Sequence, residues 1–203
     1  MAIDLSKKNE LKWVKEGRVF WAEHGALTTP AAFETDLVRQ TPDLLIRTPA
    51  GVVIVPLRVL VVTEATAATG VGTGFQCLIS SCNNDPGTSN MTAFTPINCN
   101  TRYATSGSTV TAYITNTGAT GTAPTGVADV HRVYSQPDTD AITSSTPFDQ
   151  VVYAPFHGKG IPCIVGDDSN TNAFMIHVGN ATSSDGYIIA QWAEFTYTEF
   201  YAA

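Results

Sequence analysis

Charged residues are scarce in this chain of 203 residues. Asp, Glu, Lys and Arg make up 14% of it, well below the quarter or so that is typical of soluble domains. The apolar share of 43% is ordinary, so the polar surface has to come largely from Thr, Ser, Asn and Gly. Thr favours strands because its branched side chain packs well on a pleated surface, whereas Gly and Asn favour turns. The composition predicts strands joined by many turns and argues against a helical bundle.

Basic residues are nearly absent beyond residue 60. Residues 1–60 carry 8 Lys and Arg against 7 Asp and Glu, whereas residues 61–203 carry 3 against 11, a net charge of −8. Binding to a nucleic-acid backbone needs several cations that neutralise phosphates. The larger part of the chain therefore predicts no nucleic-acid partner, and its acidity is most simply a source of solubility and mutual repulsion.

Long apolar runs are also missing. The longest covers residues 52–62 and is interrupted by Pro56 and Arg58, whereas a membrane helix needs about 20 apolar residues. The first residues, Met-Ala-Ile-Asp-Leu-Ser-Lys-Lys, contain no apolar stretch of the kind found in secretory signals. We therefore expect synthesis in a cytoplasm and no membrane partner.

The motifs of common enzyme chemistry do not occur. Residues 70–74 are glycine-rich, but no lysine or helix pattern follows them, so they do not predict a phosphate-binding loop. The chain has no Gly-x-Ser-x-Gly elbow and no His-Glu-x-x-His motif. Its four histidines are scattered, unlike the clustered His-x-His of cupin metal sites; they are His24, His131, His157 and His177. We expect no enzyme activity, no catalytic residues and no cofactor.

The cysteine count leaves the redox state open. Four cysteines permit disulfides in three connectivities; they are Cys77, Cys82, Cys99 and Cys163. Cys77 and Cys163 fall in apolar runs, where a free thiol acts as a small hydrophobic side chain. Buried free thiols are therefore the favoured interpretation for these two residues.

Short apolar runs separated by turn residues begin at Arg18. Strands are expected at residues 18–23, 44–47, 52–63, 75–81, 91–96, 109–116, 128–135, 150–156, 161–165, 173–178 and 186–197. About ten short strands without crossover helices predict a sandwich or a barrel. Pro56 predicts an edge or a bulge, and Thr28-Thr29-Pro30 predicts a helical turn that reaches Phe33. The run 186–197 has apolar residues on both faces, Trp192 among them, which predicts a central, doubly covered strand.

Residues 1–17 differ from the rest and are interpreted as an N-terminal arm, with a single β domain over residues 18–203. Asp4 or Ser6 is a candidate cap for a short helix over residues 7–16. The arm holds four of the five lysines, and it is either a solvated tail or an interface with a neighbouring subunit. The candidate interface residues are Lys7, Lys8, Leu11, Lys12, Trp13 and Val14.

The best candidate for a cation site is the loop with Asp167, Asp168 and Asn170, because hard oxygen ligands crowd one short segment. The central Gly and the later bidentate Glu of a calcium loop are absent, so the alternative is that these side chains merely shape turns. Asp138 and Asp140 form a weaker pair. No metal site is predicted beyond this candidate.

Two segments resemble phage structural proteins with jelly-roll or tumour-necrosis-factor-like folds. Residues 40–57, Gln-Thr-Pro-Asp-Leu-Leu-Ile-Arg-Thr-Pro-Ala-Gly-Val-Val-Ile-Val-Pro-Leu, look like the opening strands of those proteins. Residues 185–195, Asp-Gly-Tyr-Ile-Ile-Ala-Gln-Trp-Ala-Glu-Phe, are similar to their final strand. The resemblance implies a jelly-roll-like β-sandwich, trimeric packing and a place in a virion, next to major capsid or other virion proteins. It implies no catalytic residues, and it does not separate decoration (cement), capsid and spike proteins.

The sequence therefore favours a structural virion protein that acts through contacts between subunits. A carbohydrate- or receptor-binding module of a fibre or spike is the alternative, motivated by Trp, Thr and Asn residues in predicted loops. A cupin-like enzyme is a third hypothesis, which the histidine spacing disfavours.

Overall fold

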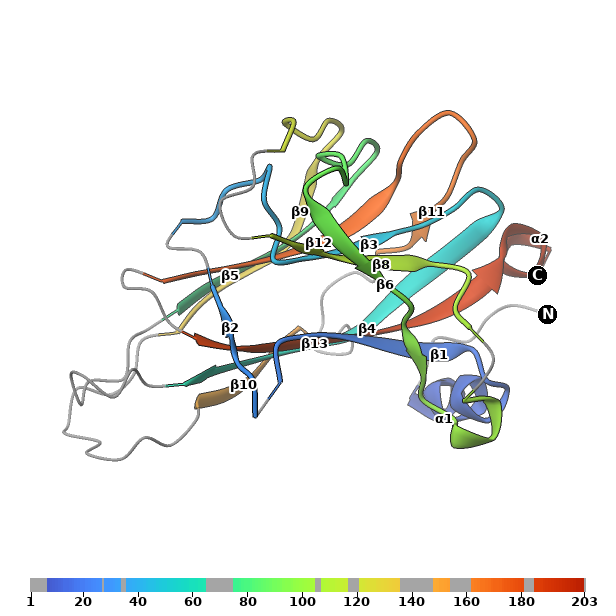
Figure 1. Cartoon of the computed structure of the whole chain (residues 1–203). Helices are drawn as coiled ribbons and strands as arrows, with labels where there is room; N and C mark the ends of the chain where they lie inside the picture. The colour runs from blue at the N-terminus through green and yellow to red at the C-terminus, as the bar shows by residue number, and fades with distance from the viewer. Residues whose placement is uncertain are drawn as a thin grey trace.

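The chain folds as two antiparallel β-sheets stacked face to face, as the computed structural model in Figure 1 shows. The structure describes residues 7–26, 28–33, 36–64, 75–104, 107–116, 121–135, 148–153, 162–180 and 185–202. The predicted all-β sandwich is confirmed. Several features that the sequence analysis considered lie outside the described residues. They are Asp138, Asp140 and His157, the glycine-rich segment 70–74 and the end of the strand expected at residues 150–156.

Within the described residues, the first sheet has seven strands. Its main path is β10 (Phe148–Tyr153), β4 (Val52–Glu64), β13 (Asp185–Thr196), β1 (Val19–His24) and β7 (Ile97–Asn98), with β11 (Ile164–Val165) beside β4 and β2 (Ala31–Ala32) beside β13. As predicted, β13 is central: it pairs along most of its length with β4 on one side and with β1 on the other.

The second sheet has six strands in the part of the chain that the structure describes. Its order is β6 (Met91–Phe94), β8 (Thr111–Thr115), β3 (Leu44–Arg47), β12 (Ala173–Asn180), β5 (Phe75–Cys82) and β9 (Ala128–Ser135). The expected boundaries agree closely with these strands, and 128–135 agrees at both ends.

The main core fills the space between the two sheets. Side chains alternate between the two faces of a strand, so Phe20 and Ala22 of β1 face the core, as do Ile188 and Trp192 of β13. Opposite them, Leu44, Ile46, Ile79, Phe174 and Ile176 point inward from the second sheet. Trp192 is only 1% exposed, which confirms its predicted place in the core.

Pro56 lies at an irregularity in β4, as its lack of an N–H predicts. The register with β13 passes from Gln191 opposite Arg58 to Trp192 opposite Pro56, so Leu57 is an additional residue in β4. On the other side of β4, β11 pairs with residues 53–54 and β10 with residues 59–63. Pro56 therefore occupies the gap between these two partners, where no donor is required from it.

The helical turn expected to reach Phe33 is wrong. Residues Ala31 and Ala32 form strand β2 instead, opposite Gly186 and Asp185 of β13. Pairing with β13 supplies ladder hydrogen bonds that a single helical turn lacks, so tertiary context overrides the local signal from Pro30. The approach is close: a side chain at Gly186 would meet the carbonyl oxygen of Val62 at 2.0 Å and the ring of Phe33 at 2.7 Å.

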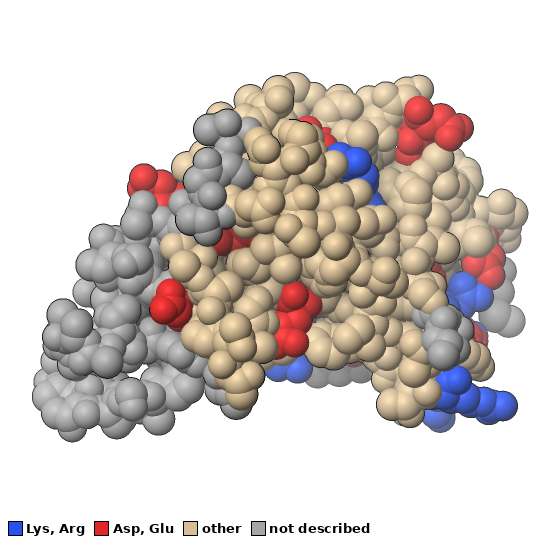
Figure 2. Space-filling view, viewed as in Figure 1, with Lys and Arg blue, Asp and Glu red and all other residues tan. Residues whose placement is uncertain are grey.

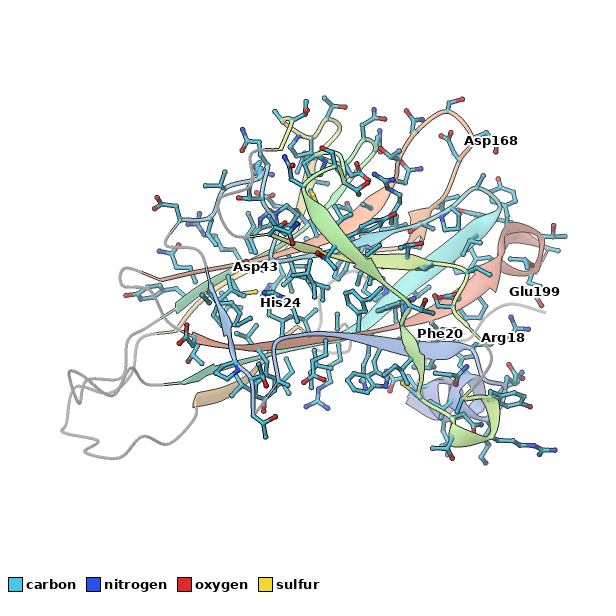
Figure 3. All side chains as sticks on the ribbon, viewed as in Figure 1. Arg18, Phe20, His24, Asp43, Asp168 and Glu199 are labelled. Carbon is cyan, nitrogen blue, oxygen red and sulfur yellow. The ribbon has the colours of Figure 1, made fainter. Side chains whose placement is uncertain are left out.

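Three short helical segments of the described chain lie outside the sheets. Helix α1 (Lys7–Lys15) agrees with the predicted helix, whereas the 3₁₀ turn η1 (Thr101–Tyr103) and helix α2 (Tyr197–Tyr201) were not predicted. Helix α2 begins with a capping box in which Thr196 and Glu199 satisfy each other's backbone N–H groups. Glu199 also accepts two hydrogen bonds from Arg18, at 2.8 and 3.0 Å, which ties α2 to the start of β1 (Figure 3).

Candidate functional site: an outer sheet face and an end cavity

Helix α1 covers one part of the outer face of the first sheet. Trp13 is 4% exposed and meets Phe195 edge-on, with ring centroids 5.2 Å apart at 80°. Around them is a second apolar cluster, which contains Val19, Val55, Leu57 and Ala193. Trp13 therefore packs within its own chain, which leaves little of its side chain for the contact with a neighbouring subunit that the sequence suggested.

A sharp turn explains why α1 docks on its own sheet. Arg18 N–H bonds to the carbonyl of Trp13 and Gly17 N–H to that of Val14, with Gly17 at φ +73°. This Schellman ending reverses the chain directly into β1. Asn100 holds the same end, because its Nδ2 donates to the Val14 carbonyl at 3.0 Å. The apolar sheet face is thus covered by the nearest segment in sequence.

The other interface candidates on α1 differ in exposure. Leu11 is 59% exposed, and Lys12 is exposed with its Nζ 3.8 Å from Glu16. Val14 is partly buried against the Trp13 cluster. Lys7 and Lys8 belong to α1, and their side chains lie outside the described part of the chain. Of the interface candidates whose side chains the structure describes, only Leu11 and Lys12 are thus exposed.

The candidate cation loop is built as a turn. Asp167 Oδ1 accepts the backbone N–H groups of Ser169 and Asn170, and its Oδ2 accepts Asn170 Nδ2 at 2.7 Å. These hydrogen bonds, the one from the Asn170 side chain first, lower the pKa of Asp167. Asp168 is exposed at the tip of the loop (Figure 3). Within the described ranges, no three His, Cys, Asp or Glu side chains lie close enough to hold a metal. The geometry favours the turn-shaping alternative.

Beyond α1, the outer face of the first sheet carries partly exposed apolar side chains. Trp21 lies opposite Gln191, and Leu60 lies opposite Ile189, so these residues share one face. Ile97 lies opposite Trp21 on β7 and is 53% exposed. We call this surface the outer sheet patch; it comprises Trp21, Glu23, Arg58, Leu60, Ile97 and Ile189.

The outer sheet patch holds one charge of each sign. Arg58 lies on β4 opposite Gln191, and Glu23 lies on β1 opposite Ile189, so the two flank β13 on the same face. Neither joins an ion pair with another described residue. Partial burial raises the pKa of Glu23. The Glu23 carboxylate is thus partly removed from water and forms no ion pair with a described residue. It is well placed to pair with a cation on another molecule.

A cavity of about 310 Å³ opens between the sheets at one end of the sandwich. Its walls come from the end of β1, from β2, from the residues that lead into β3 and from the end of β8; the lining residues are His24, Ala31, Ala32, Thr41, Asp43, Ile114, Thr115 and Asn116. Figure 3 shows His24 and Asp43 close together at this end, between the two sheets. We call this space the end cavity.

The two ionisable residues of the end cavity are both buried. His24 is 9% exposed, and burial lowers its pKa to about 4. Its Nδ1 is buried and has no hydrogen-bond partner among the described residues. Asp43 is 5% exposed, and its Oδ2 accepts the backbone N–H of Val178 at 2.6 Å. At neutral pH the cavity therefore presents a neutral imidazole with an unused nitrogen.

A second buried histidine, His177, lies on the face of the second sheet that points away from the main core. His177 is 1% exposed, and neither ring nitrogen makes a well-formed hydrogen bond, although the backbone of Val38 lies close. Burial lowers the pKa of His177 to about 4, with the nearby Arg39 as a further cause. Arg39 in turn makes two hydrogen bonds of 2.9 Å to Asp129 on β9.

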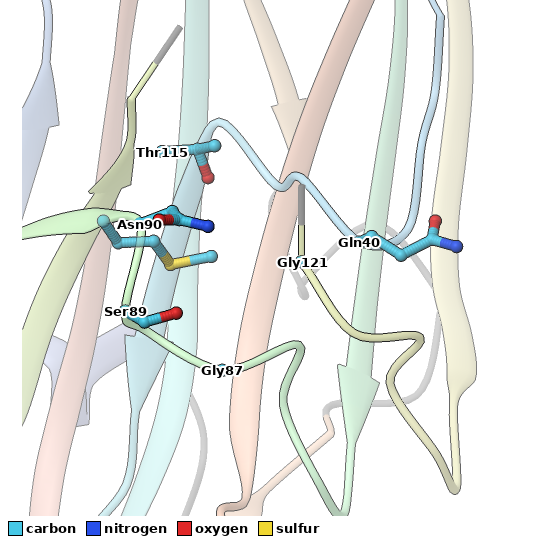
Figure 4. A pocket seen from close by; sticks show the side chains of 7 residues that line it. Gln40, Gly87, Ser89, Asn90, Thr115 and Gly121 are labelled. Atoms are coloured by element: carbon cyan, nitrogen blue, oxygen red, sulfur yellow. The ribbon is translucent and has the colours of Figure 1, made fainter. Parts of the chain in front are cut away.

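A smaller cavity, shown in Figure 4, is too small for a ligand. It has a volume of about 10 Å³, which is about the room that one water molecule needs. It lies among loop residues that include Gln40, Gly87 and Gly121. The end cavity is therefore the better candidate for binding.

All four cysteines are free. Cys77 and Cys82 are buried, Cys99 is partly buried and Cys163 is exposed. The expected burial of Cys77 is confirmed, whereas that of Cys163 is wrong, because the residue lies just before the short strand β11. In the part of the chain that the structure describes, no helix has the length and apolar character needed to cross a membrane.

Comparisons of the chain with protein-family models, with curated proteins and with solved structures found no match. Function has to be inferred from the chain's own residues. The sequence-based interpretation missed both the outer sheet patch and the end cavity. A usable signal was present for Arg58, which is the only charged residue in the apolar run 52–62. No sequence signal indicated that His24 and Asp43 line the same cavity, because their proximity depends on how the two sheets stack.

Proposed function

We propose that the two sheets form a jelly roll. Four antiparallel pairs are nested along the chain: β1 with β13, β3 with β12, β4 with β10, and β5 with β9. The first of these strands thus pairs with the last, the second with the last but one, and so on inward. Rolling one long hairpin into two sheets gives this nesting, which is the plan of a jelly roll.

On this scaffold, we propose that the chain is a structural subunit of a virus or phage particle. It acts by packing against copies of itself and against major capsid or other virion proteins, as a decoration (cement) protein or a capsid subunit. The outer sheet patch is the observation that carries the proposal, because partly exposed apolar residues on adjoining strands mark an interaction surface. The low charge of the molecule agrees with it: Figure 2 shows only scattered charged side chains on the side where β6 and β8 lie.

The charges of the outer sheet patch favour another copy of the chain as the partner. Symmetry presents the Glu23 of one copy to the Arg58 of the next, so a closed ring, such as the expected homotrimer, satisfies every charge. Exposed ion pairs stabilise by only about 0–1 kcal/mol each. Affinity therefore comes from burying Trp21, Leu60 and Ile189, at about 25 cal/mol per Å², while the charges set register and orientation.

Charge reversal tests this assembly mode. The Arg58→Glu and Glu23→Arg variants should each shift the protein toward monomer in sedimentation-velocity experiments, because like charges then face each other. The double variant should recover the oligomer, since each pair is restored with reversed sign. Arg132→Glu, an exposed change on β9, is the matched control and should leave assembly unaltered.

The outcomes separate two errors. A wild-type chain that stays monomeric up to about millimolar concentration contradicts self-assembly itself. A wild-type oligomer that tolerates both single reversals contradicts the outer sheet patch as its interface. The virion location is tested separately by mass spectrometry of purified particles, in which the chain should be present in stoichiometric amount; its absence would contradict that location.

The tryptophans give little support to the alternative of a sugar-binding fibre module. Trp13 and Trp192 are buried at 4% and 1% exposure, and Trp21 lies on a strand of the sheet. Stacking of a sugar on a loop tryptophan is thus not available among the described residues.

A further inference from the structure

We infer that the end cavity binds a small, neutral, polyhydroxylated molecule of the size of one sugar or sugar alcohol. This inference is independent of self-assembly, because the end cavity lies between the sheets and the outer sheet patch lies on an outer face.

The size of the end cavity fits such a molecule. Small-molecule sites have volumes of roughly 300–1,000 Å³, and the end cavity holds about 310 Å³. It is too large to be an ordinary packing defect in a close-packed interior and suits a single compact ligand.

The buried His24 indicates that something polar occupies the space. A buried nitrogen that lacks a partner destabilises a fold by about 1–3 kcal/mol, and His24 Nδ1 is in that position. Apolar side chains from the neighbouring strands would fill this end of the core at no such cost. A hydroxyl group can either donate to or accept from the neutral imidazole, so it satisfies the ring in both tautomers.

The lining also determines which ligands are disfavoured. The described residues that line it include no Lys or Arg, so they offer no cation to a phosphate or a carboxylate. Purely apolar ligands would leave the His24 nitrogen unsatisfied. Metal ions lack a ligand set, since no group of three suitable side chains occurs among the described residues.

The remaining groups match a polyol. Thr41 is a hydroxyl-bearing residue of the lining, and Asn116 brings an amide whose oxygen accepts the hydroxyl of Thr92 at 2.8 Å and whose nitrogen can donate. The hydroxyl of Thr115 is already bound to the carbonyl of Pro42. Ala31 and Ile114 provide apolar side chains, which suit the C–H face of a sugar ring. Neutral donors and acceptors on one side and small apolar side chains on the other are what a polyhydroxylated ring requires.

The test is saturation-transfer NMR on the full chain, followed by titration calorimetry. The probes are D-glucose, D-galactose, D-mannose, L-rhamnose and sorbitol, with glucose 6-phosphate and acetate as anions that should not bind. Oligosaccharides that end in the same sugars form a second arm. Saturable binding of a free sugar identifies a free ligand, whereas binding of the oligosaccharides alone identifies the end of a glycan; either result supports the inference.

Two variants locate the binding. Ala31→Leu adds volume at the cavity wall, because Ala31 is the residue of β2 that faces the space between the sheets, and it should weaken binding at least tenfold. Thr41→Val removes one hydroxyl and should weaken binding about tenfold. Ala128→Leu, on the exposed side of β9, makes the same change away from the cavity and should have no effect. Thermal unfolding confirms that each variant is folded. The inference is overturned if no neutral probe binds saturably, or if the Ala31→Leu and Thr41→Val variants bind as tightly as the wild type.

Discussion

The indole Nε1–H of Trp192 donates to the carboxylate of Glu194, 2.9 Å away and two residues along the same face of β13. Glu194 is 8% exposed. It also accepts the hydroxyls of Ser108 and Thr109 and the backbone N–H of Thr109. This buried carboxylate therefore joins the core tryptophan to the segment that leads into β8.

Replacing Glu194 should be strongly destabilising. Glu194→Ala leaves the donors of Trp192, Ser108 and Thr109 without their acceptor, and hydrogen bonds to a charged group are worth about 1.5–3 kcal/mol each. We expect a loss of at least about 3 kcal/mol in the free energy of unfolding, measured by urea denaturation. Glu194→Gln keeps an acceptor and should cost less. Equal losses in the two variants would show that packing, and not hydrogen bonding, accounts for the effect.

The two buried histidines predict a loss of stability on mild acidification. The folded-state pKa of His24 and His177 is about 4, below the ordinary value of about 6.5, so the unfolded chain binds protons more readily. The stabilisation is complete above pH 6.5 and is lost as the pH falls toward 4. The difference corresponds to about 3 kcal/mol per histidine.

The measurement is the free energy of unfolding by urea from pH 8 to pH 4. His177→Leu should flatten this profile between pH 6.5 and pH 4, because Arg39 and Asp129 remain while the titrating ring is gone. The hydrogen bond from Arg18 is the main reason that the pKa of the Glu199 carboxylate is lowered to about 2. Glu199 therefore loses its contribution to the free energy of unfolding only as the pH falls below 4.5. An unchanged profile in the variant would exclude His177 as a source of the acid sensitivity.

Most strands could be predicted because their signals are local. The run 52–64 is apolar and bounded by turn residues, and Pro56 marked its irregularity correctly. Helix α2 was missed although Thr196 and Glu199 have the spacing of a capping box, because the preceding apolar run was extended through Tyr197. Strand β2 was missed for a different reason, since its partner in β13 lies far away in sequence.

The candidate site depends on contacts that the sequence does not reveal. Glu23 and Arg58 share a face only because β13 lies between their strands in a particular register. A shift of one residue in either pairing would turn one of them toward the core. The end cavity likewise depends on how β1 and β8, from different sheets, approach each other. Local patterns carry strand identity, whereas register and stacking come from the whole fold.

The four thiols should react with Ellman's reagent in an order set by their burial. Cys163 is exposed and should react first. Burial raises the pKa of Cys99 and brings that of Cys82 to about 11, and it also raises the pKa of Cys77. The thiolate is the reactive form, so Cys77 and Cys82 should react only when the chain unfolds. Cys163→Ser should remove the fast phase; a fast phase that persists would contradict the assigned exposure.

Helix α1 should contribute to the stability of the isolated subunit, contrary to the expectation of a free arm. Trp13 fills a cluster with Val19, Leu57 and Phe195, and replacing a buried tryptophan by alanine costs about 3–5 kcal/mol. Trp13→Ala should lower the free energy of unfolding by about that amount, measured by denaturation of monomeric protein.

Leu11 provides the matched control, because it lies on the same helix with 59% of its surface exposed. Leu11→Ala should change the free energy of unfolding by less than about 0.5 kcal/mol, as surface substitutions usually do. If Leu11 instead contacts a neighbouring subunit, its replacement should weaken the oligomer and leave the monomer's stability unaltered. Equal and small effects of both replacements on the monomer would mean that α1 is detached from the sheet in solution, and the first 17 residues would then be an arm after all.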